Sequence, residues 1–260
     1  MEELDTKKYA GIDLGKTSVQ FSIYREGQEE MSEESFPIAK EQQEAYIETG
    51  IHLVEEYMKE KEYQWSDYQA VHFSMQDPSE ENRDKLKESV SEEFLKFHTV
   101  KVITHFRAFA EYVFHQERIM WDRNTLLLDY HDNQLSYVLI DQIRRSRQKA
   151  YRAVEKQIDL NEYRVVEGTP EQDANFGQMV KRFLVKNPAN IIFLTGSGFE
   201  GNWMKKTLTY LCAGRRVFLG QNLYANGACL LGIHPIELMD EGMILMDLSL
   251  IHISEPTRRS

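Results

Sequence analysis

Long apolar runs are absent from this sequence, since none approaches the ~20 residues that a membrane-spanning helix needs. Residues 1–8 are charged and no apolar segment follows them, so they do not resemble a secretory signal peptide. Cysteine is also scarce, because Cys212 and Cys229 are too few for a disulfide framework and lack the spacing of metal ligands. We therefore expect a cytoplasmic protein with two buried, reduced thiols and no membrane partner.

Basic residues are rarer than acidic ones. The chain has 31 Lys and Arg against 42 Asp and Glu, which gives a formal net charge of −11 at pH 7. Such a chain repels the phosphates of nucleic acids unless a local basic patch compensates. A candidate patch lies between two predicted strands and is typical of a solvated hairpin tip; it consists of Arg144, Arg145, Arg147 and Lys149. We expect no nucleic-acid partner.

Two similar rounds of strands and helices are predicted within the 260 residues, a length that allows one large domain or two smaller ones. Each round begins with two strands joined by a turn and continues with alternating helices and strands, and the break falls near residues 120–124. The repeated order predicts an α/β protein with an internal duplication and two lobes around a shared cleft. We place the first lobe at residues 1–120 and the second at residues 121–247.

A turn rich in small and hydroxyl residues follows the first predicted strand, in the segment GIDLGKTSV of residues 11–19. Asp13 provides a carboxylate at the end of a strand, where it can hold a hydrated divalent cation. Gly15 permits a sharp turn, so that backbone amides can face phosphate oxygens together with the side chains of Lys16, Thr17 and Ser18. Taken alone, the segment also fits an ordinary hairpin.

In two further segments, residues that can bind a ligand directly follow an apolar strand. Gly196, Ser197 and Gly198 lie between such a strand and a helix, so the backbone can approach a ligand closely and the helix N-terminus can face an anion. Asp129 follows the first strand of the second round, and two acids in equivalent places would suit a metal–nucleotide complex. The ordinary alternatives are a glycine-containing turn and a turn-forming aspartate.

Taken in order, these segments resemble the nucleotide-binding core of the actin, sugar-kinase and DnaK-type chaperone superfamily. The matching segments are residues 11–19 for the first phosphate loop, 70–90 for the strand and polar helix after it, 104–112 for the first interlobe helix, 126–140 for the second phosphate loop, 191–208 for the adenosine element and 225–228 for the second interlobe helix. The resemblance implies a duplicated ribonuclease-H-like fold, the actin-like ATPase fold, with ATP or ADP and Mg²⁺ between two lobes.

The same resemblance implies roles for single residues. Asp13 and the turn residues Gly15, Lys16, Thr17 and Ser18 would meet the metal and the β- and γ-phosphates. The turn at residues 196–198 would pass beneath the adenosine. Asp129 would face the water shell of the metal, so the two aspartates are the candidate catalytic residues and the candidate metal contacts.

Two departures from the superfamily argue against rapid ATP hydrolysis. The second phosphate loop reads DYHDNQ at residues 129–134 and has no glycine, so side chains would crowd the phosphates. Residues 104–107 (THFR) lack the carboxylate that helps to position the attacking water in the chaperones. A narrower resemblance, over residues 195–224, is to an uncharacterised bacterial family whose members carry this module and a further C-terminal region and have no assigned activity.

The C-terminal segment has a resemblance of its own. Residues 248–258 (LSLIHISEPTR) resemble the in-frame translation of a common sequencing adapter. A native polar tail is the alternative. Under the adapter interpretation the natural chain continues past Asp247 into a part that is missing here, so we assign no function to residues 248–260.

Three functions stay open on this basis. The first is a conformational switch that binds ATP or ADP with Mg²⁺, hydrolyses it weakly or not at all, and signals to a protein partner or to the missing C-terminal region. The second is a scaffold of the same fold that no longer binds nucleotide, which the glycine-free second loop favours. The third is a small-molecule kinase, for whose catalytic base Asp122 and Asp129 are the nearby candidates.

Overall fold

The computed structural model describes residues 6–121, 123–131, 133–145, 148–239 and 243–245. Three features singled out in the sequence therefore lie outside the described residues, namely Asp122, Arg147 and the adapter-like tail. The chain forms two compact units, residues 1–120 with 219–235 and residues 121–218 with 236–260. Within the described part, no helix combines the length and the apolar character needed to cross a membrane.

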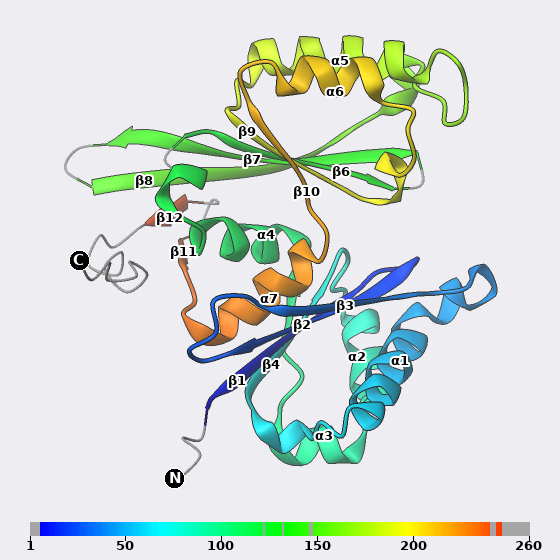
Figure 1. The fold of residues 1–260 in the computed structure, drawn as a ribbon, viewed down its shortest axis with the longest axis vertical. Coiled ribbons are helices and arrows are strands. Elements are labelled where there is room, and N and C mark those ends of the chain that lie inside the picture. The colour runs from blue at the N-terminus through cyan, green and yellow to red at the C-terminus, as the bar shows by residue number, and fades with distance from the viewer. Residues whose placement is uncertain (1–5, 122, 132, 146–147, 240–242, 246–260) are drawn as a thin grey trace. The chain divides into compact units, whose positions relative to one another are not determined.

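The first unit is built on a five-stranded sheet of order β3-β2-β1-β4-β5 (Figure 1). β1 pairs antiparallel with β2 and parallel with β4, and β4 pairs parallel with β5. Its strands and helices are β1 (Lys8–Leu14), β2 (Ser18–Arg25), β3 (Ser32–Pro37), α1 (Tyr46–Glu60), β4 (Tyr68–Met75), α2 (Glu80–Ser89), α3 (Glu92–Phe97), β5 (Val102–Thr104), α4 (His105–Phe114) and α7 (Leu223–Ile233).

The second unit repeats this topology. Its seven-stranded sheet has the order β10-β9-β6-β7-β8-β12-β11, so the first five strands of the unit are arranged as in the first sheet. Two short strands extend it beyond β8. Its elements are β6 (Thr125–His131), β7 (Gln134–Arg145), β8 (Gln148–Ile158), α5 (Gln172–Lys186), β9 (Ile191–Thr195), α6 (Lys205–Cys212), β10 (Arg216–Leu219), β11 (Glu237–Met239) and β12 (Met243–Leu245). The expected duplication and α/β class are confirmed.

Helices cover both faces of the first sheet, with α1, α2 and α3 on one face and α4 and α7 on the other (Figure 1). The face of α1 that packs on the sheet carries Ile47, Ile51, Val54 and Met58, each at most 4% exposed. Their spacing of three or four residues places them on one side of the helix. The sequence pattern therefore decides which side of α1 is buried.

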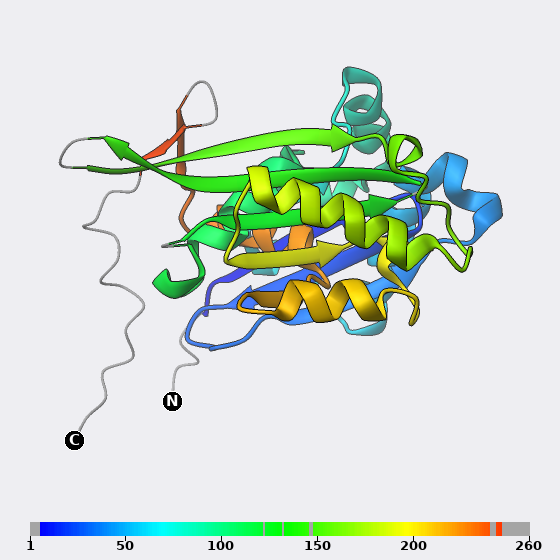
Figure 2. The ribbon, with the colours of Figure 1, turned by 90° about the horizontal axis from the view of Figure 1, so that it is seen from above.

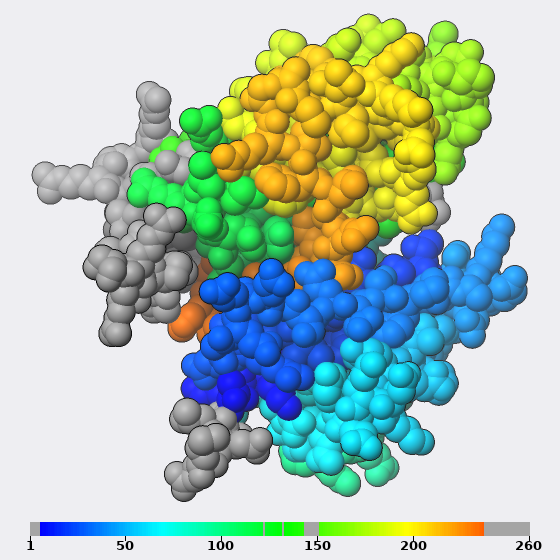
Figure 3. Space-filling view, viewed as in Figure 1, coloured from blue at the N-terminus to red at the C-terminus, as the bar shows by residue number. Residues whose placement is uncertain are grey.

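In the second unit, α5 and α6 lie across one face of the sheet (Figure 2) and form the outer surface there (Figure 3). The core beneath them contains Tyr130 and Phe176, whose rings stack with centroids 6.2 Å apart. Asp173 of α5 accepts hydrogen bonds from the backbone N–H groups of Lys206 and Thr207 in the first turn of α6. This carboxylate satisfies donors that the helix start leaves unpaired, so it links the two helices.

Helix α7 belongs to the first unit, whereas the sequence analysis assigned residues 219–235 to the second lobe. The helix packs against β1, β4 and α4, and two glycines allow the close approach. A Cβ atom on Gly11 of β1 would lie 2.0 Å from the carbonyl oxygen of Ala225, and one on Gly227 would lie 1.8 Å from that of Ala108. Only glycine fits at these two crossings. The two glycines therefore allow α7, which is far away in the sequence, to pack closely against β1 and α4.

The expectation of two buried thiols is wrong for one of them. Cys229 is fully buried on α7, and burial raises its pKa to about 12. Cys212 is exposed at the last residue of α6, whose buried side carries Thr207 and Leu211. The position of Cys212 on the solvent side of a short helix is the physical reason for the difference.

Candidate functional site

Asp13 lies near the end of β1 and is 5% exposed. Its Oδ1 atom accepts a hydrogen bond of 2.8 Å from the hydroxyl of Ser74, the residue opposite it in the parallel pairing of β1 with β4. The same oxygen lies 2.8 Å from Nε2 of His105, which starts α4. Because a carboxylate only accepts hydrogen bonds, Nε2 of His105 must carry the proton in this contact.

The ring of His105 is held in place from two sides. It stacks on the ring of Tyr224 in α7, with centroids 3.8 Å apart and planes 9° apart. Its Nδ1 atom is buried and makes no hydrogen bond within the described part of the chain. The imidazole therefore covers one side of the Asp13 carboxylate, and a ligand of that carboxylate has to compete with it.

The turn between β1 and β2 is tight. The Gly15 N–H donates to the carbonyl oxygen of Ser18 at 3.0 Å, so this amide closes the turn. A Cβ atom on Gly15 would lie 2.9 Å from the same oxygen, which explains the glycine by geometry alone. Lys16 is exposed, while Thr17 and Ser18 are half-buried. The predicted turn is confirmed, and its lysine and two hydroxyl residues stand next to the buried acid.

Asp129 occupies the equivalent position in the second unit. It lies opposite Thr195 in the parallel pairing of β6 with β9, as Asp13 lies opposite Ser74. Like Asp13 it is 5% exposed, and its Oδ1 lies 3.0 Å from Nε2 of His131. Each unit thus ends its first strand with a buried aspartate next to a histidine and across from a hydroxyl residue.

Ser197 joins this second group. Its backbone N–H donates to Nδ1 of His131 at 3.4 Å, and its hydroxyl oxygen lies 3.3 Å from the same atom. Because Nδ1 accepts from the amide, the proton of a neutral ring sits on Nε2 and faces Asp129. The glycine turn and the end of β6 are thereby connected through His131, which the sequence analysis recorded only as part of a loop without glycine.

The two glycines of this turn are needed by the protein itself. Gly196 has φ = +102°, and a Cβ atom there would lie 2.3 Å from the carbonyl oxygen of Tyr130. A Cβ atom on Gly198 would lie 2.3 Å from the ring of Tyr130. Packing against Tyr130 therefore accounts for both glycines, without any ligand.

Other polar contacts near α4 and α7 have no counterpart in the sequence analysis. The side-chain amides of Asn222 and Asn226 donate to the carboxylate of Glu33, 189 and 193 residues away in the sequence. On α4, the fully buried carboxylate of Glu111 binds the guanidinium of Arg107. Glu111 sits away from solvent, so it does not replace the water-positioning acid that residues 104–107 lack. The spacing of four residues between Arg107 and Glu111 is the sequence signal that could have predicted this ion pair on one side of a helix.

Among the described residues, no group of three or more histidine, cysteine or acidic side chains could hold a metal ion. A cation at Asp13 would therefore keep most of its water shell, as Mg²⁺ prefers. Both hydrogen bonds described for the carboxylate go to Oδ1, which leaves Oδ2 as an acceptor. The oxygen donors of this strand end suit a hydrated Mg²⁺, which would compete with His105 for the charge of the same carboxylate.

The duplicated sheet order and the paired strand ends define the class: this chain has the actin-like ATPase fold. A solved structure with this fold, the activator of the 2-hydroxyisocaproyl-CoA dehydratase from Clostridium difficile with bound ADPNP, is 10% identical with a TM-score of 0.53. The similarity covers 86% of this chain and 94% of that one. Component A of the (R)-2-hydroxyglutaryl-CoA dehydratase from Acidaminococcus fermentans gives 11% identity and a TM-score of 0.50, over 86% and 96% of the two chains.

The particular family is defined by sequence. Residues 23–247 match the C-terminal region of a family of unknown function, DUF5716, and the chain belongs to this family. The matched range begins within β2, so it leaves out Asp13 and the turn after β1, and it ends just before the adapter-like tail, whose origin stays a prediction. No protein of curated function matches the sequence.

Proposed function

We propose that this protein binds ADP or ATP with Mg²⁺ and acts as a conformational switch with weak or no hydrolysis. In this proposal the metal and the β- and γ-phosphates meet Asp13, Lys16, Thr17 and Ser18 in the first unit. The second unit contributes Asp129, toward the water shell of the metal, and the turn of residues 196–198, beneath the adenosine. A nucleotide that binds one conformation of the protein more tightly than another shifts the equilibrium toward it. A protein partner would recognise the conformation that the nucleotide favours.

One observation supports the proposal above the others. Asp13 and Asp129 occupy equivalent positions in two sheets of the same topology, and both are 5% exposed. A buried carboxylate is costly unless it is hydrogen bonded or meets a cation. Both carboxylates already have polar partners, so their equivalent placement at duplicated strand ends, and not their burial, favours a shared ligand over two independent turn formers. The ADPNP in the Clostridium difficile activator belongs to that protein, and makes an adenine nucleotide a reasonable first ligand to test.

Bound Mg²⁺ would supply positive charge to the phosphates. The residues of this chain would orient the ligand: the Asp13 carboxylate would hold the water shell, and Lys16 would offer a flexible cation. In the first turns of α4, His105 binds Asp13 and the buried Glu111 binds Arg107, so neither side chain is free to activate water there. Slow turnover is the expected consequence.

A second candidate function has its own support. A scaffold without nucleotide is favoured by the way in which the protein already uses its motif residues: the Gly15 amide closes its own turn, and Tyr130 requires Gly196 and Gly198. The contact between His105 and Asp13 also favours the scaffold, because it occupies the carboxylate that a metal would need. Of the two candidate bases of the kinase alternative, Asp122 lies outside the described residues and Asp129 is buried beside His131, so the described part of the chain offers no comparable observation in its favour.

The test is the melting temperature of the full chain with and without millimolar ADP or ATP and Mg²⁺, alongside titration with a fluorescent ADP analogue. A ligand that binds only the folded state stabilises it by about 2.7 kcal/mol at a hundred times its Kd. Asp13→Asn should remove the Mg²⁺-dependent part of the shift. Glu88→Gln makes the same chemical change at an exposed site on α2 and should leave the shift intact.

Either outcome is informative about function. A shift that depends on Mg²⁺ and on Asp13 supports the switch, and steady release of phosphate would then measure turnover. A well-folded protein that shows neither a melting shift nor a fluorescence change would reject the switch in favour of the scaffold.

A further inference from the structure

Part of one edge of the first sheet is unpaired. β4 pairs with β5 only where Phe73–Met75 lie opposite Val102–Thr104. Within the described residues, no strand pairs with the earlier part of β4, residues 68–72, on that side. The N–H of Phe73 points to this side, because it donates to the carbonyl oxygen of Lys101 at 2.9 Å. Alternate residues of a regular strand direct their backbone groups to the same edge, so those of Val71 point there too. The pairing of β4 with β1 shifts register at Gln69, where this alternation ends.

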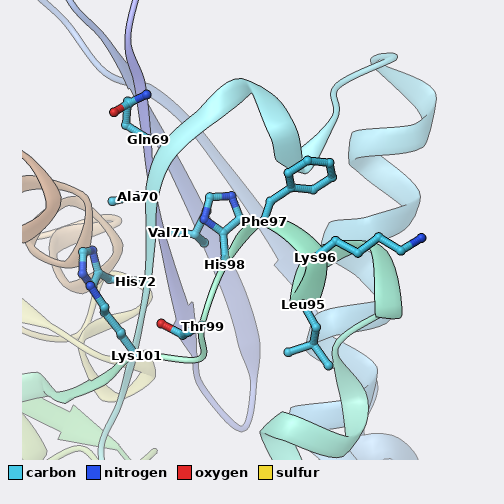
Figure 4. A pocket seen from close by; sticks show the side chains of 10 residues that line it. All are labelled: Gln69, Ala70, Val71, His72, Leu95, Lys96, Phe97, His98, Thr99 and Lys101. Atoms are coloured by element: carbon cyan, nitrogen blue, oxygen red, sulfur yellow. The ribbon is translucent and has the colours of Figure 1, made fainter.

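This open edge borders a cavity of about 300 Å³ (Figure 4). Its other wall is the end of α3 and the segment that leads to β5. In Figure 4 the side chains of Lys96 and Phe97 point outward from β4, and that of Lys101 runs beside His72. Leu95 and Phe97 are 50% and 54% exposed, so the rim carries two apolar side chains in contact with water. The cavity has the size of a small ligand pocket and is open along a strand.

The charge around the cavity is of one sign. Among its ten lining residues are two lysines and two histidines and no acid, in a chain with a net charge of −11. His72 is 6% exposed, and its Nδ1 has no hydrogen-bond partner in the described part of the chain. Burial, with help from Lys101 and His98, lowers the pKa of His72 to about 4, so His72 is neutral at pH 7, while Lys96 and Lys101 carry positive charge.

We propose that this groove binds an extended acidic peptide segment, which adds to the sheet beside residues 69–71 of β4. Unpaired N–H and C=O groups in a row are a template for strand addition. A groove with cations and no carboxylate selects against basic segments and favours acidic ones. The apolar rim at Leu95 and Phe97 offers contact area for alternate side chains of the peptide. The inference does not depend on nucleotide binding, because all of these residues lie in the first unit away from Asp13.

Two properties separate strand addition from simple charge attraction. Strand addition needs the outward N–H groups of β4, whereas an anion on Lys101 does not. It also needs the N–H groups of the peptide itself. The test therefore changes the backbone and the charge separately, on both partners.

The probes are three fluorescent, end-capped octapeptides, and binding to the full chain is followed by fluorescence anisotropy. One alternates aspartate and valine, one alternates lysine and valine, and the third is the acidic peptide with alternate backbone nitrogens methylated. We expect the acidic peptide to bind with a Kd below about 1 mM, and the other two at least about tenfold more weakly. Protection of amide hydrogens at residues 69–71 from exchange should accompany binding.

Four variants locate the interaction. Val71→Pro removes an outward N–H from the edge, while Val71→Ala shortens the same side chain and keeps the N–H. We expect about a tenfold loss of acidic-peptide affinity in the first and little change in the second. Lys101→Glu should weaken binding similarly, and Lys59→Glu, an exposed lysine on α1, should not. Circular dichroism and melting curves check that each variant is folded.

Three results would overturn the proposal. They are no binding of the acidic peptide up to about 1 mM, equal binding of the methylated peptide, and unchanged affinity in folded Val71→Pro and Lys101→Glu proteins. Equal binding of the methylated peptide with loss in Lys101→Glu would identify an anion site in place of a strand partner.

Discussion

Nε2 of His105 lies 2.8 Å from Oδ1 of Asp13, although 92 residues separate the two in the sequence. The contact places an imidazole on the very carboxylate that the sequence points to as a metal ligand. Tyr224 stacks on a face of the ring and limits its movement. Whether His105 assists or obstructs a ligand of Asp13 is therefore a direct question for mutagenesis.

We predict that His105→Ala strengthens the binding of Mg²⁺-nucleotide by about three- to tenfold. The reason is that one hydrogen bond to the carboxylate, worth about 1 kcal/mol, no longer competes with the water shell of the cation. Titration with the fluorescent ADP analogue measures the effect, and His52→Ala, an exposed histidine on α1, is the control. A weaker affinity in His105→Ala would instead assign His105 to the ligand itself.

Gly227→Ala should destabilise the first unit by about 3 kcal/mol, because the new methyl group would collide with the backbone of α4 at Ala108. Gly232→Ala is a matched control on the same helix, where the added Cβ atom would meet side-chain atoms at 3.2 Å or more. The higher helix propensity of alanine, about 1 kcal/mol, should offset most of that contact. Urea denaturation of the two variants gives the comparison, and similar losses would contradict the close crossing of α7 and α4.

The role of Gly198 can be tested by a double-mutant cycle with Tyr130. Gly198→Ala alone should cost about 2–3 kcal/mol of stability, since its methyl group would overlap the Tyr130 ring. In a Tyr130→Ala background the same change should cost less than about 1 kcal/mol, because the ring is gone. Additive costs in urea denaturation would show that Gly198 is required for another reason, such as a ligand.

His72 should make the stability of the first unit depend on pH. Its pKa of about 4 in the folded protein lies below the ordinary value of 6.5, so the folded state binds the proton less readily than the unfolded state. The contribution is fully present above 6.5 and is lost as the pH falls toward 4. We expect a loss of about 2 kcal/mol between about pH 7.5 and pH 5.

The measurement for His72 is urea denaturation at both pH values, with His72→Leu beside the natural protein. The leucine variant should lose less stability on acidification, since it has no group to protonate there. An equal pH dependence in both proteins would assign the effect to other groups.

Much of the fold follows from local patterns. Apolar spacing on α1 and the two strand–turn–strand segments predict elements that the structure contains, and the repeated order predicts the duplication. The position of Asp129 after a strand equivalent to that of Asp13 also follows from the order of elements. Such predictions succeed because strand and helix periodicity is written in neighbouring residues.

The sequence by itself determined the elements, their repeated order and the acids that end two strands. The tertiary structure decided what surrounds these acids, since His105 reaches Asp13 from another element. It also decided that α7 completes the first unit and that Tyr130 accounts for the glycines at 196 and 198. The physical reason is that these contacts join residues far apart in the chain, and only the packed topology sets which distant atoms come within 3 Å of one another.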